Sequence, residues 1–248
     1  MSKCGLMRAM RKVAIVTGSA KGLGRYLTLA FANQGYTVVI HYRQSKKEAQ
    51  KVFNLIQKKS PASIIVSGDL CIQETVGKIF KEIYSKLGRV DLLVNNVGDF
   101  IHKEFAKTTN QEFVNIVESN LYPALFCSRA VLPHMRKAKS GHIINIGTVG
   151  AERLTLRKKS TPYFAAKNAL YYLTKVMAWE EASAGIHVNM VSPASLTADI
   201  FKSSDFPMGR LANYEDVVKV ISFLTSKDAY YINGANIEVA GAFVPGFS

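Results

Sequence analysis

The fold of this 248-residue chain is decided near its start, where residues 13–24 read Val13-Ala14-Ile15-Val16-Thr17-Gly18-Ser19-Ala20-Lys21-Gly22-Leu23-Gly24. A short apolar run of strand type is followed there by three glycines at the spacing Gly-x-x-x-Gly-x-Gly. Such glycines let the backbone turn sharply and approach a pyrophosphate, whose charge is favoured at the N-terminus of the next helix. The stretch predicts a strand–turn–helix unit that binds a dinucleotide, with an ordinary glycine-rich turn as the alternative.

Apolar runs and amphipathic stretches alternate along the rest of the chain. The runs are apolar throughout, which is typical of strands buried on both faces of a parallel sheet. We therefore expect an α/β fold: a single Rossmann-like domain, a parallel sheet with helices on both faces. After Val13–Thr17, strands are expected at Thr37–Tyr42, Ser63–Ser67, Asp91–Asn95, His142–Ile146, Ile186–Val191 and Asn236–Val239. Helices are expected at Arg25–Gln34, Lys46–Lys58, Ile72–Leu87, Glu112–Met135, Tyr163–Ala184 and Asp216–Leu224.

No linker or repeat divides the chain, so one domain is expected to span residues 11–248. Residues 1–10 read as an N-terminal tail without the apolar core of a signal peptide. Met7 and Met10 lie within that tail, so the true start codon is left open.

Composition excludes a disordered, collagen-like or disulfide-stapled chain, because 48% of the residues are hydrophobic and 20% are charged. The three cysteines are odd in number and far apart, which favours reduced thiols inside a cell. No apolar run reaches the ~18–20 residues that a membrane span needs. We expect a cytoplasmic protein without membrane contact and, because the histidines are scattered, without a metal site.

The net charge of +14 permits nucleic acid, anionic lipid or an anionic substrate as partner. No nucleic-acid-binding motif accompanies the charge, so no nucleic acid is expected. A solvated basic surface is the plainer interpretation.

Three further positions point to dinucleotide chemistry. Asp69 follows the third expected strand, where its carboxylate could accept a hydrogen bond from an adenine amino group. Asn95-Asn96-Val97-Gly98 ends the fourth, on the side where such sheets bind ligands. Tyr163 and Lys167 are four residues apart on one helix face. An ammonium group near a phenol lowers the phenol pKa from about 10, which would make Tyr163 a usable acid or base.

In this order the motifs resemble those of the short-chain dehydrogenase/reductase family, and the similarity runs from Arg11 to the end. It includes Asn120 in Ser119-Asn120-Leu121, and Val188-Asn189 before Ser192-Pro193. The resemblance implies a Rossmann-like domain that assembles as a homodimer or homotetramer. It also implies a nicotinamide cofactor held by Thr17, Gly18, Ser19, Lys21, Gly22, Leu23, Gly24, Arg43, Asp69, Leu70, Asn95, Val97, Gly98, Tyr163, Lys167 and Pro193.

The resemblance assigns four catalytic positions. Tyr163 would protonate the carbonyl oxygen as hydride arrives. Lys167 would bind the nicotinamide ribose and lower the Tyr163 pKa, and Asn120 would hold a water that resupplies protons. Thr148 stands where the family has a serine that polarises the carbonyl; its hydroxyl can donate the same bond, but its extra methyl restricts it.

Other positions depart from the family pattern. Val97 and Ala194 add bulk where the family has alanine and glycine, and Gly241-Ala242 replaces a Gly-Gly pair. The segment from Pro193 to Arg210 spans only 210 − 193 = 17 positions, which predicts a more open pocket without a long helical lid.

Cofactor choice is readable from charge. The second strand is followed by Arg43, with no acid until Glu48, and Lys21 precedes the second motif glycine. Basic residues at these two places resemble those that hold the 2′-phosphate of NADP(H), and two surface cations are the alternative.

The substrate is less defined. Arg153, Arg157, Lys158 and Lys159 would form a positive rim with Lys139, which resembles a carrier-docking position of 3-oxoacyl carrier protein reductases in fatty acid biosynthesis. A second docking position falls near Ala184, which is neutral, and a charge run is often only a solvated loop. A small carbonyl substrate, such as a 3-oxoacyl thioester on an acidic carrier protein, is the first expectation.

Alternatives stay open. Ser192-Pro193-Ala194-Ser195-Leu196 resembles the variant loop of pteridine reductases, which act on dihydropterin or dihydrofolate rings. Sugars and steroids are further substrates that this family takes. The altered Thr148 and glycines leave room for a non-catalytic dinucleotide-binding protein on the same fold.

Overall fold

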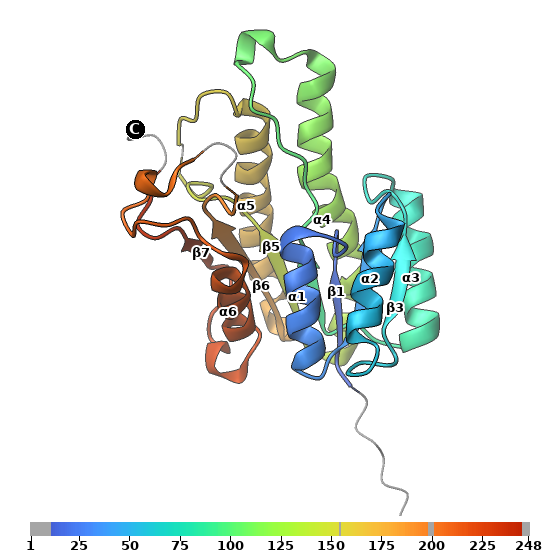
Figure 1. Cartoon of the computed structure of the whole chain (residues 1–248). Coiled ribbons are helices and arrows are strands. Elements are labelled where there is room, and N and C mark those ends of the chain that lie inside the picture. The colour runs from blue at the N-terminus through green and yellow to red at the C-terminus, as the bar shows by residue number, and fades with distance from the viewer. Residues whose placement is uncertain (1–10, 154, 198–200, 245–248) are drawn as a thin grey trace, which may run out of the picture.

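The computed structural model describes residues 11–153, 155–197 and 201–244. The expected tail, residues 1–10, lies outside these. Within the described residues the chain forms one parallel sheet in the order β3-β2-β1-β4-β5-β6-β7, which confirms the Rossmann-like α/β prediction (Figure 1). The strands are β1 (Val13–Val16), β2 (Thr37–Tyr42), β3 (Ile64–Ser67), β4 (Leu92–Asn95), β5 (Gly141–Ile146), β6 (Ile186–Pro193) and β7 (Asn236–Val239).

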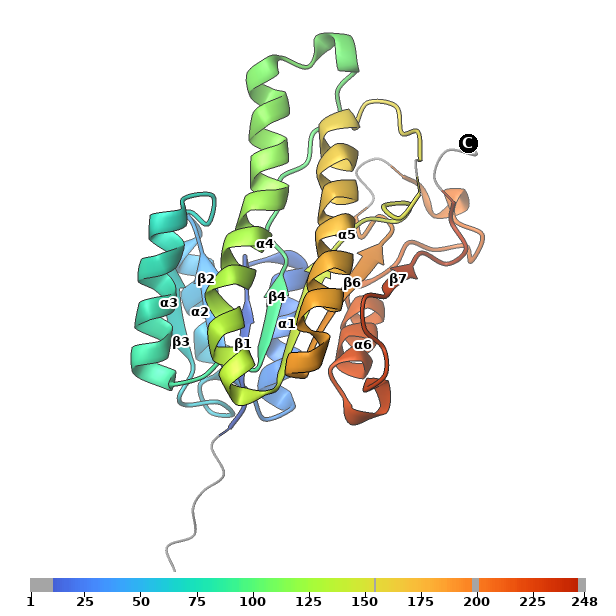
Figure 2. The same cartoon turned by 180° about the vertical axis from the view of Figure 1, so that it is seen from behind.

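Helices cover both faces of the sheet, as expected (Figures 1 and 2). One face carries α1 (Gly22–Asn33), α2 (Lys46–Ile56) and α6 (Tyr214–Leu224); the other carries α3 (Gln73–Leu87), α4 (Asn110–Ala138) and α5 (Thr161–Glu181). Short 3-10 helices lie at Phe105–Lys107, Ala182–Ala184, Ser203–Asp205 and Lys227–Ala229.

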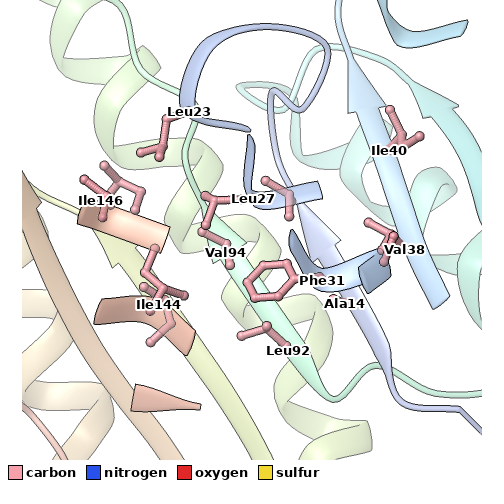
Figure 3. Packing of buried hydrophobic residues seen from close by; sticks show 14 of the residues in the cluster. Ala14, Leu23, Leu27, Phe31, Val38, Ile40, Leu92, Val94, Ile144 and Ile146 are labelled. Atoms are coloured by element: carbon pink, nitrogen blue, oxygen red, sulfur yellow. The ribbon is translucent and has the colours of Figure 1, made fainter. Parts of the chain in front are cut away.

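The two hydrophobic cores explain why β1 is apolar throughout and why the other strands are mostly apolar. In β1, Ala14 and Val16 point into the core beneath α1, α2 and α6, where Leu27 and Phe31 are fully buried (Figure 3). Val13 and Ile15 point into the opposite core beneath α3, α4 and α5. Because side chains alternate between the faces of a strand, burial on both faces requires an unbroken apolar run.

Helix ends differ from the expected ones by a few residues, and the differences matter at the site. α1 begins at Gly22 rather than Arg25, so the motif glycines enter its first turn. α4 begins at Asn110 because Thr109 forms a capping box with Glu112. α5 begins at Thr161 with a proline in its first turn, which places Tyr163 in that turn rather than at the helix start.

The site is positioned by the sheet order. β1 lies between β2 and β4. The connection after β1 leads toward one edge of the sheet and the connection after β4 leads toward the other, so a crevice forms between them at the carboxyl ends of the strands. The N-terminal half of α4 extends beyond those ends (Figures 1 and 2). No helix of the described chain is long and apolar enough to cross a membrane. No cluster of three or more His, Cys, Asp or Glu in the same residues could hold a metal ion.

Candidate active site

The glycine-rich turn after β1 is fastened to the end of β4. The Thr17 hydroxyl oxygen accepts hydrogen bonds from the Asn96 amide (2.8 Å) and the Val97 amide (3.1 Å). The Asn96 side chain in turn donates to the Thr17 carbonyl oxygen at 2.9 Å. These bonds join two of the expected cofactor segments at the point where the sheet order reverses.

Two glycines of the turn are required by geometry. Gly18 has φ +64°, a left-handed conformation that side chains disfavour. A Cβ atom on Gly24 would collide with the Gly18 carbonyl oxygen, so α1 can pack this closely on the turn only with glycine there. The backbone is thus shaped as a cradle for a pyrophosphate at the N-terminus of α1.

His41 of β2 supports this turn, and the sequence reading missed it. Its Nδ1 accepts from the Gly18 amide at 3.1 Å, and its Nε2 lies 3.0 Å from the Gly68 carbonyl oxygen. The ring is therefore neutral with the proton on Nε2. Burial lowers the pKa of His41, in keeping with that state. A histidine within a β-branched run carries no signal of such a role.

A cavity of about 260 Å³ lies beside the turn. Its walls come from the turn, the ends of β2 and β4 and the β3–α3 loop, as an adenosine moiety would require. Six of the expected cofactor residues line it: Gly18, Arg43, Asp69, Leu70, Val97 and Gly98, together with Asn96.

Both expected phosphate-binding cations face a carboxylate in the structure. The Arg43 guanidinium lies 3.6 Å from Asp69, and the Lys21 ammonium lies 4.0 Å from Glu48. Asp69 also accepts from the Cys71 amide at 2.9 Å, which fixes its orientation at the cavity wall. These long, exposed ion pairs are weak, so an anion can displace either carboxylate.

A second cavity, of about 460 Å³, opens at the carboxyl ends of β5 and β6. It brings together Thr148, Tyr163 and Pro193 with Leu23 of α1, and it shares Asn96 with the first cavity. The two cavities therefore adjoin at Asn96, an arrangement that suits a dinucleotide beside a substrate.

Two aromatic rings pack against the half-buried Tyr163. Phe100 meets it edge to face at 5.0 Å between ring centroids, and Phe164 at 5.9 Å. Burial raises the pKa of Tyr163 to about 12, and a hydrogen bond with the Thr148 side chain opposes the rise. The phenol therefore holds its proton at neutral pH, as a proton donor must.

Lys167 is buried one helical turn beyond Tyr163. Its ammonium donates to the Ile146 carbonyl oxygen at 2.8 Å and lies 5.5 Å from the centroid of the Tyr163 ring. Burial lowers the pKa of Lys167 to about 8. Desolvation is the largest influence on the Tyr163 pKa in the chain alone, and the lowering of that pKa by Lys167 stays a prediction.

Asn120 of α4 presents an unused acceptor. Its side-chain amide donates to the carbonyl oxygens of Asp99 (2.7 Å) and Ile116 (2.8 Å). The Oδ1 atom is buried with no partner in the described chain. A buried acceptor without a partner is costly, and a water molecule is the usual remedy. The residues present therefore fit a nicotinamide cofactor and the water that the resemblance assigns to Asn120.

The expected basic rim is split by the structure. Arg153 pairs with Glu238 of β7 at 2.8 Å, and Glu238 also accepts from the Gly150 amide at 2.7 Å. Lys158 and Lys159 are exposed, and Arg157 alone of the rim residues lines the second cavity.

Lys139 is not part of the rim within one chain, and that expectation is wrong. It follows α4 just ahead of β5, at the amino edge of the sheet, whereas the cavity opens at the carboxyl edge. Its backbone packs against Gly185, so the neutral Ala184 position lies beside it.

The segment between β6 and α6 contains no α-helix in its described part; the 3-10 helix Ser203–Asp205 is its helical element. Phe201 from this segment packs with Phe206 and Phe243 at 5.9 and 5.5 Å and reaches the second cavity. Residues 198–200, within the expected lid segment, lie outside the described residues.

Known proteins are similar to this chain in sequence and in fold. The family model for short chain dehydrogenases matches residues 12–206. A 3-oxoacyl-[acyl-carrier-protein] reductase of Staphylococcus epidermidis is 33% identical over 94% of this chain and 98% of its own length. The Haemophilus influenzae protein of that name is 32% identical over 93% and 97%.

Solved structures agree. Acetoin dehydrogenase from Salmonella typhimurium superposes with a TM-score of 0.86 at 30% identity, covering 94% of this chain and 96% of that one. The match spans nearly the whole length of both chains. The chain belongs to the short-chain dehydrogenase family, and it is an oxidoreductase that binds a nicotinamide dinucleotide.

Proposed function

We propose that the protein is an NADPH-dependent reductase that converts a carbonyl group to an alcohol, with Tyr163 as the proton donor. The observation that carries the proposal is the cavity at the carboxyl ends of β5 and β6, which holds Tyr163 and Thr148 together and shares Asn96 with the cavity beside the glycine turn. A reduced nicotinamide supplies the hydride.

The residues of the chain would then stabilise the developing negative charge on the carbonyl oxygen. The Thr148 hydroxyl donates a hydrogen bond to that oxygen, and Tyr163 gives it a proton. The rings of Phe100 and Phe164 cover part of the Tyr163 ring and reduce its contact with water, which favours both interactions. Lys167 favours the phenolate that remains, since an adjacent ammonium stabilises it.

Lys167 and Asn120 would return a proton to Tyr163 after each turnover. Lys167 has a pKa of about 8, so it can gain and lose a proton near neutral pH. The unpartnered Asn120 Oδ1 would hold a water between Lys167 and solvent.

The preference for NADPH rests on Arg43 and Lys21. Both are exposed cations beside the adenosine cavity or the turn, and each is paired only weakly. A 2′-phosphate would offer each a stronger, charge-assisted partner than the present carboxylate.

A 3-oxoacyl thioester is the first substrate candidate, because two relatives that are 32–33% identical to this chain are named 3-oxoacyl-[acyl-carrier-protein] reductases. Apolar residues such as Phe164, Leu196 and Phe201 line the cavity and suit an acyl chain. The exposed Lys158 and Lys159 near its mouth, with the net charge of +14, would attract an acidic carrier protein.

A homodimer or homotetramer is proposed from the outer faces of α4 and α5. Tyr172 and Trp179 are seven residues apart on α5 and 72% and 87% exposed. Val114 and Tyr122, eight apart on α4, are exposed too. Exposed aromatic side chains on neighbouring helices are typical of a protein interface. Sedimentation of Trp179→Glu against wild type tests it.

The test of the activity is NADPH oxidation with a panel of a 3-oxoacyl thioester, its carrier-linked form, a small diketone and a dihydropterin. Tyr163→Phe keeps the ring and removes the acid, so cofactor affinity should persist while turnover collapses. Carrier-linked substrate should outperform the soluble thioester, and its advantage should shrink with salt. Turnover of the dihydropterin alone would replace the substrate class; no turnover of any carbonyl would overturn the proposal.

A further inference from the structure

Arg157 occupies an unusual place in the catalytic cavity. It lies in the loop between β5 and α5 and lines the cavity together with Tyr163. Its guanidinium carbon stands 4.6 Å from the centroid of the Phe201 ring and 5.5 Å from that of Phe243. Contact with the ring faces orients the planar group and leaves its N–H edges available for hydrogen bonds.

The charge of Arg157 has no counter-charge in the described chain. Its neighbour Arg153 is paired with Glu238, but Arg157 makes no hydrogen bond or ion pair with any described residue. Among the described residues that line the cavity there is no Asp or Glu, and Arg157 is the one Lys or Arg. Burial lowers the pKa of Arg157, an expression of the same desolvation.

A half-buried cation of this kind destabilises the free protein. Contact with the two aromatic faces orients the guanidinium but supplies no counter-charge, so the desolvation of the charge stays uncompensated. As a brace for the aromatic cluster it would be a poor choice, because Phe201, Phe206 and Phe243 already pack on one another. The arrangement is explained by an anion that arrives with the substrate.

We propose that Arg157 binds a carboxylate of the substrate, which therefore carries an acid group in addition to the carbonyl reduced at Tyr163. The proposal rests on the carbonyl reduction proposed above and narrows its substrate class to oxo acids or acyl groups with a carboxylate. The forked edge of a guanidinium matches a carboxylate in two parallel hydrogen bonds. A single charge in the described lining matches a monoanion, whereas a phosphate dianion would keep one charge unmatched.

Binding can be measured without turnover, with the protein saturated with oxidised NADP. Calorimetry compares 2-oxobutanoate, 4-oxopentanoate and 5-oxohexanoate with their methyl esters. Wild type should bind at least one acid ~10-fold or more tightly than its ester, because a hydrogen bond to a charged group is worth about 1.5–3 kcal/mol. Arg157→Gln should abolish the difference, and Arg157→Lys should keep part of it.

Two controls separate the site from its surroundings. Lys158→Gln makes the same change in net charge one residue away on the exposed side of the loop, and it should preserve the acid-to-ester ratio. Asp199 lies outside the described residues, two positions before Phe201 in the sequence. Asp199→Asn should also leave the ratio unchanged; a large gain in acid affinity would mean that Arg157 is held by Asp199, which overturns the proposal.

Each remaining outcome is decisive. Equal affinities for every acid and ester in wild type, or an equal loss of both in Arg157→Gln, would overturn the carboxylate site and make Arg157 a structural brace. Reduction of the methyl esters by NADPH, measured in parallel, reports on the reductase itself. Esters reduced equally by wild type and Arg157→Gln, with no acid preference, would leave the proposed reductase standing and remove only this inference.

Discussion

The backbone amide of Gly18 donates a hydrogen bond to Nδ1 of the buried His41 ring, 3.1 Å away. The first glycine of the cofactor turn is thereby fixed by a side chain from the next strand, and only the neutral ring can accept that bond. Protonation of His41 would place an N–H on Nδ1 against the N–H of Gly18, so that two donors would face each other at the glycine turn.

His41 is therefore expected to couple acid to the cofactor turn. Its folded-state pKa lies below the usual 6.5, so the unfolded chain binds more protons between those two values. Stability from this group is present above about pH 6.5 and is lost as the pH falls through the folded pKa. His41→Gln, which does not titrate, should flatten the acid limb of the unfolding free energy against pH. An unchanged profile by denaturant titration would contradict the prediction.

Lys167 is expected to limit stability while serving catalysis. Its pKa of about 8 lies below the usual 10.5, so the unfolding free energy should rise with pH across that interval. At neutral pH the buried charge costs on the order of 3 kcal/mol, and the bond to the Ile146 carbonyl returns about 1. Lys167→Met should therefore be inactive yet more stable by about 1–2 kcal/mol. Thermal unfolding at pH 7 measures it, and a less stable variant would disprove the argument.

Thr148 is expected to replace the serine of the family pattern. Thr148→Ala removes one donor to the developing oxyanion, which costs about 10²–10³-fold in kcat when such donors are lost elsewhere. Thr148→Ser keeps the hydroxyl and should stay active. Steady-state kinetics on the best carbonyl of the panel compare them; full activity in the alanine variant would make Thr148 a bystander.

The preference for NADPH over NADH is expected to depend on the cations Arg43 and Lys21 and on the carboxylates that now face them. Arg43→Ala should reduce NADPH affinity by ~10-fold or more and leave NADH nearly unchanged, since only NADPH carries the 2′-phosphate. Glu48→Gln releases Lys21 from its 4.0 Å partner and should strengthen NADPH binding. Fluorescence titration of both cofactors at low and high salt provides the measurement. Equal affinities of wild type for NADPH and NADH would refute the assignment.

The fold was predictable because its signals are local and repeated. Mostly apolar strands, helical spacing and the glycine turn each follow from short-range rules. Helix starts were less accurate: α4 begins two residues early because the Thr109–Glu112 capping box lies just ahead of its apolar pattern.

Charges were predicted least well, because their partners are distant in sequence. The sequence around Arg153 does not indicate that Glu238, 85 residues away, is its partner. The sequence around Lys21 likewise does not indicate that the fold brings Glu48 close to it. Lys139 was assigned to the wrong edge of the sheet because sequence order alone does not say which strand end a cluster will join. His41 and Phe243 became part of the two sites only through tertiary packing.

The Glu238 contact has a consequence for biosynthesis. This carboxylate in β7 holds the loop after β5 through Gly150 and Arg153, and that loop carries Thr148. Glu238 follows that loop by 85 or more positions in the sequence, so during synthesis the loop is made well before its anchor. The loop that carries Thr148 should therefore become ordered only after Glu238 has been added and β7 has paired with β6.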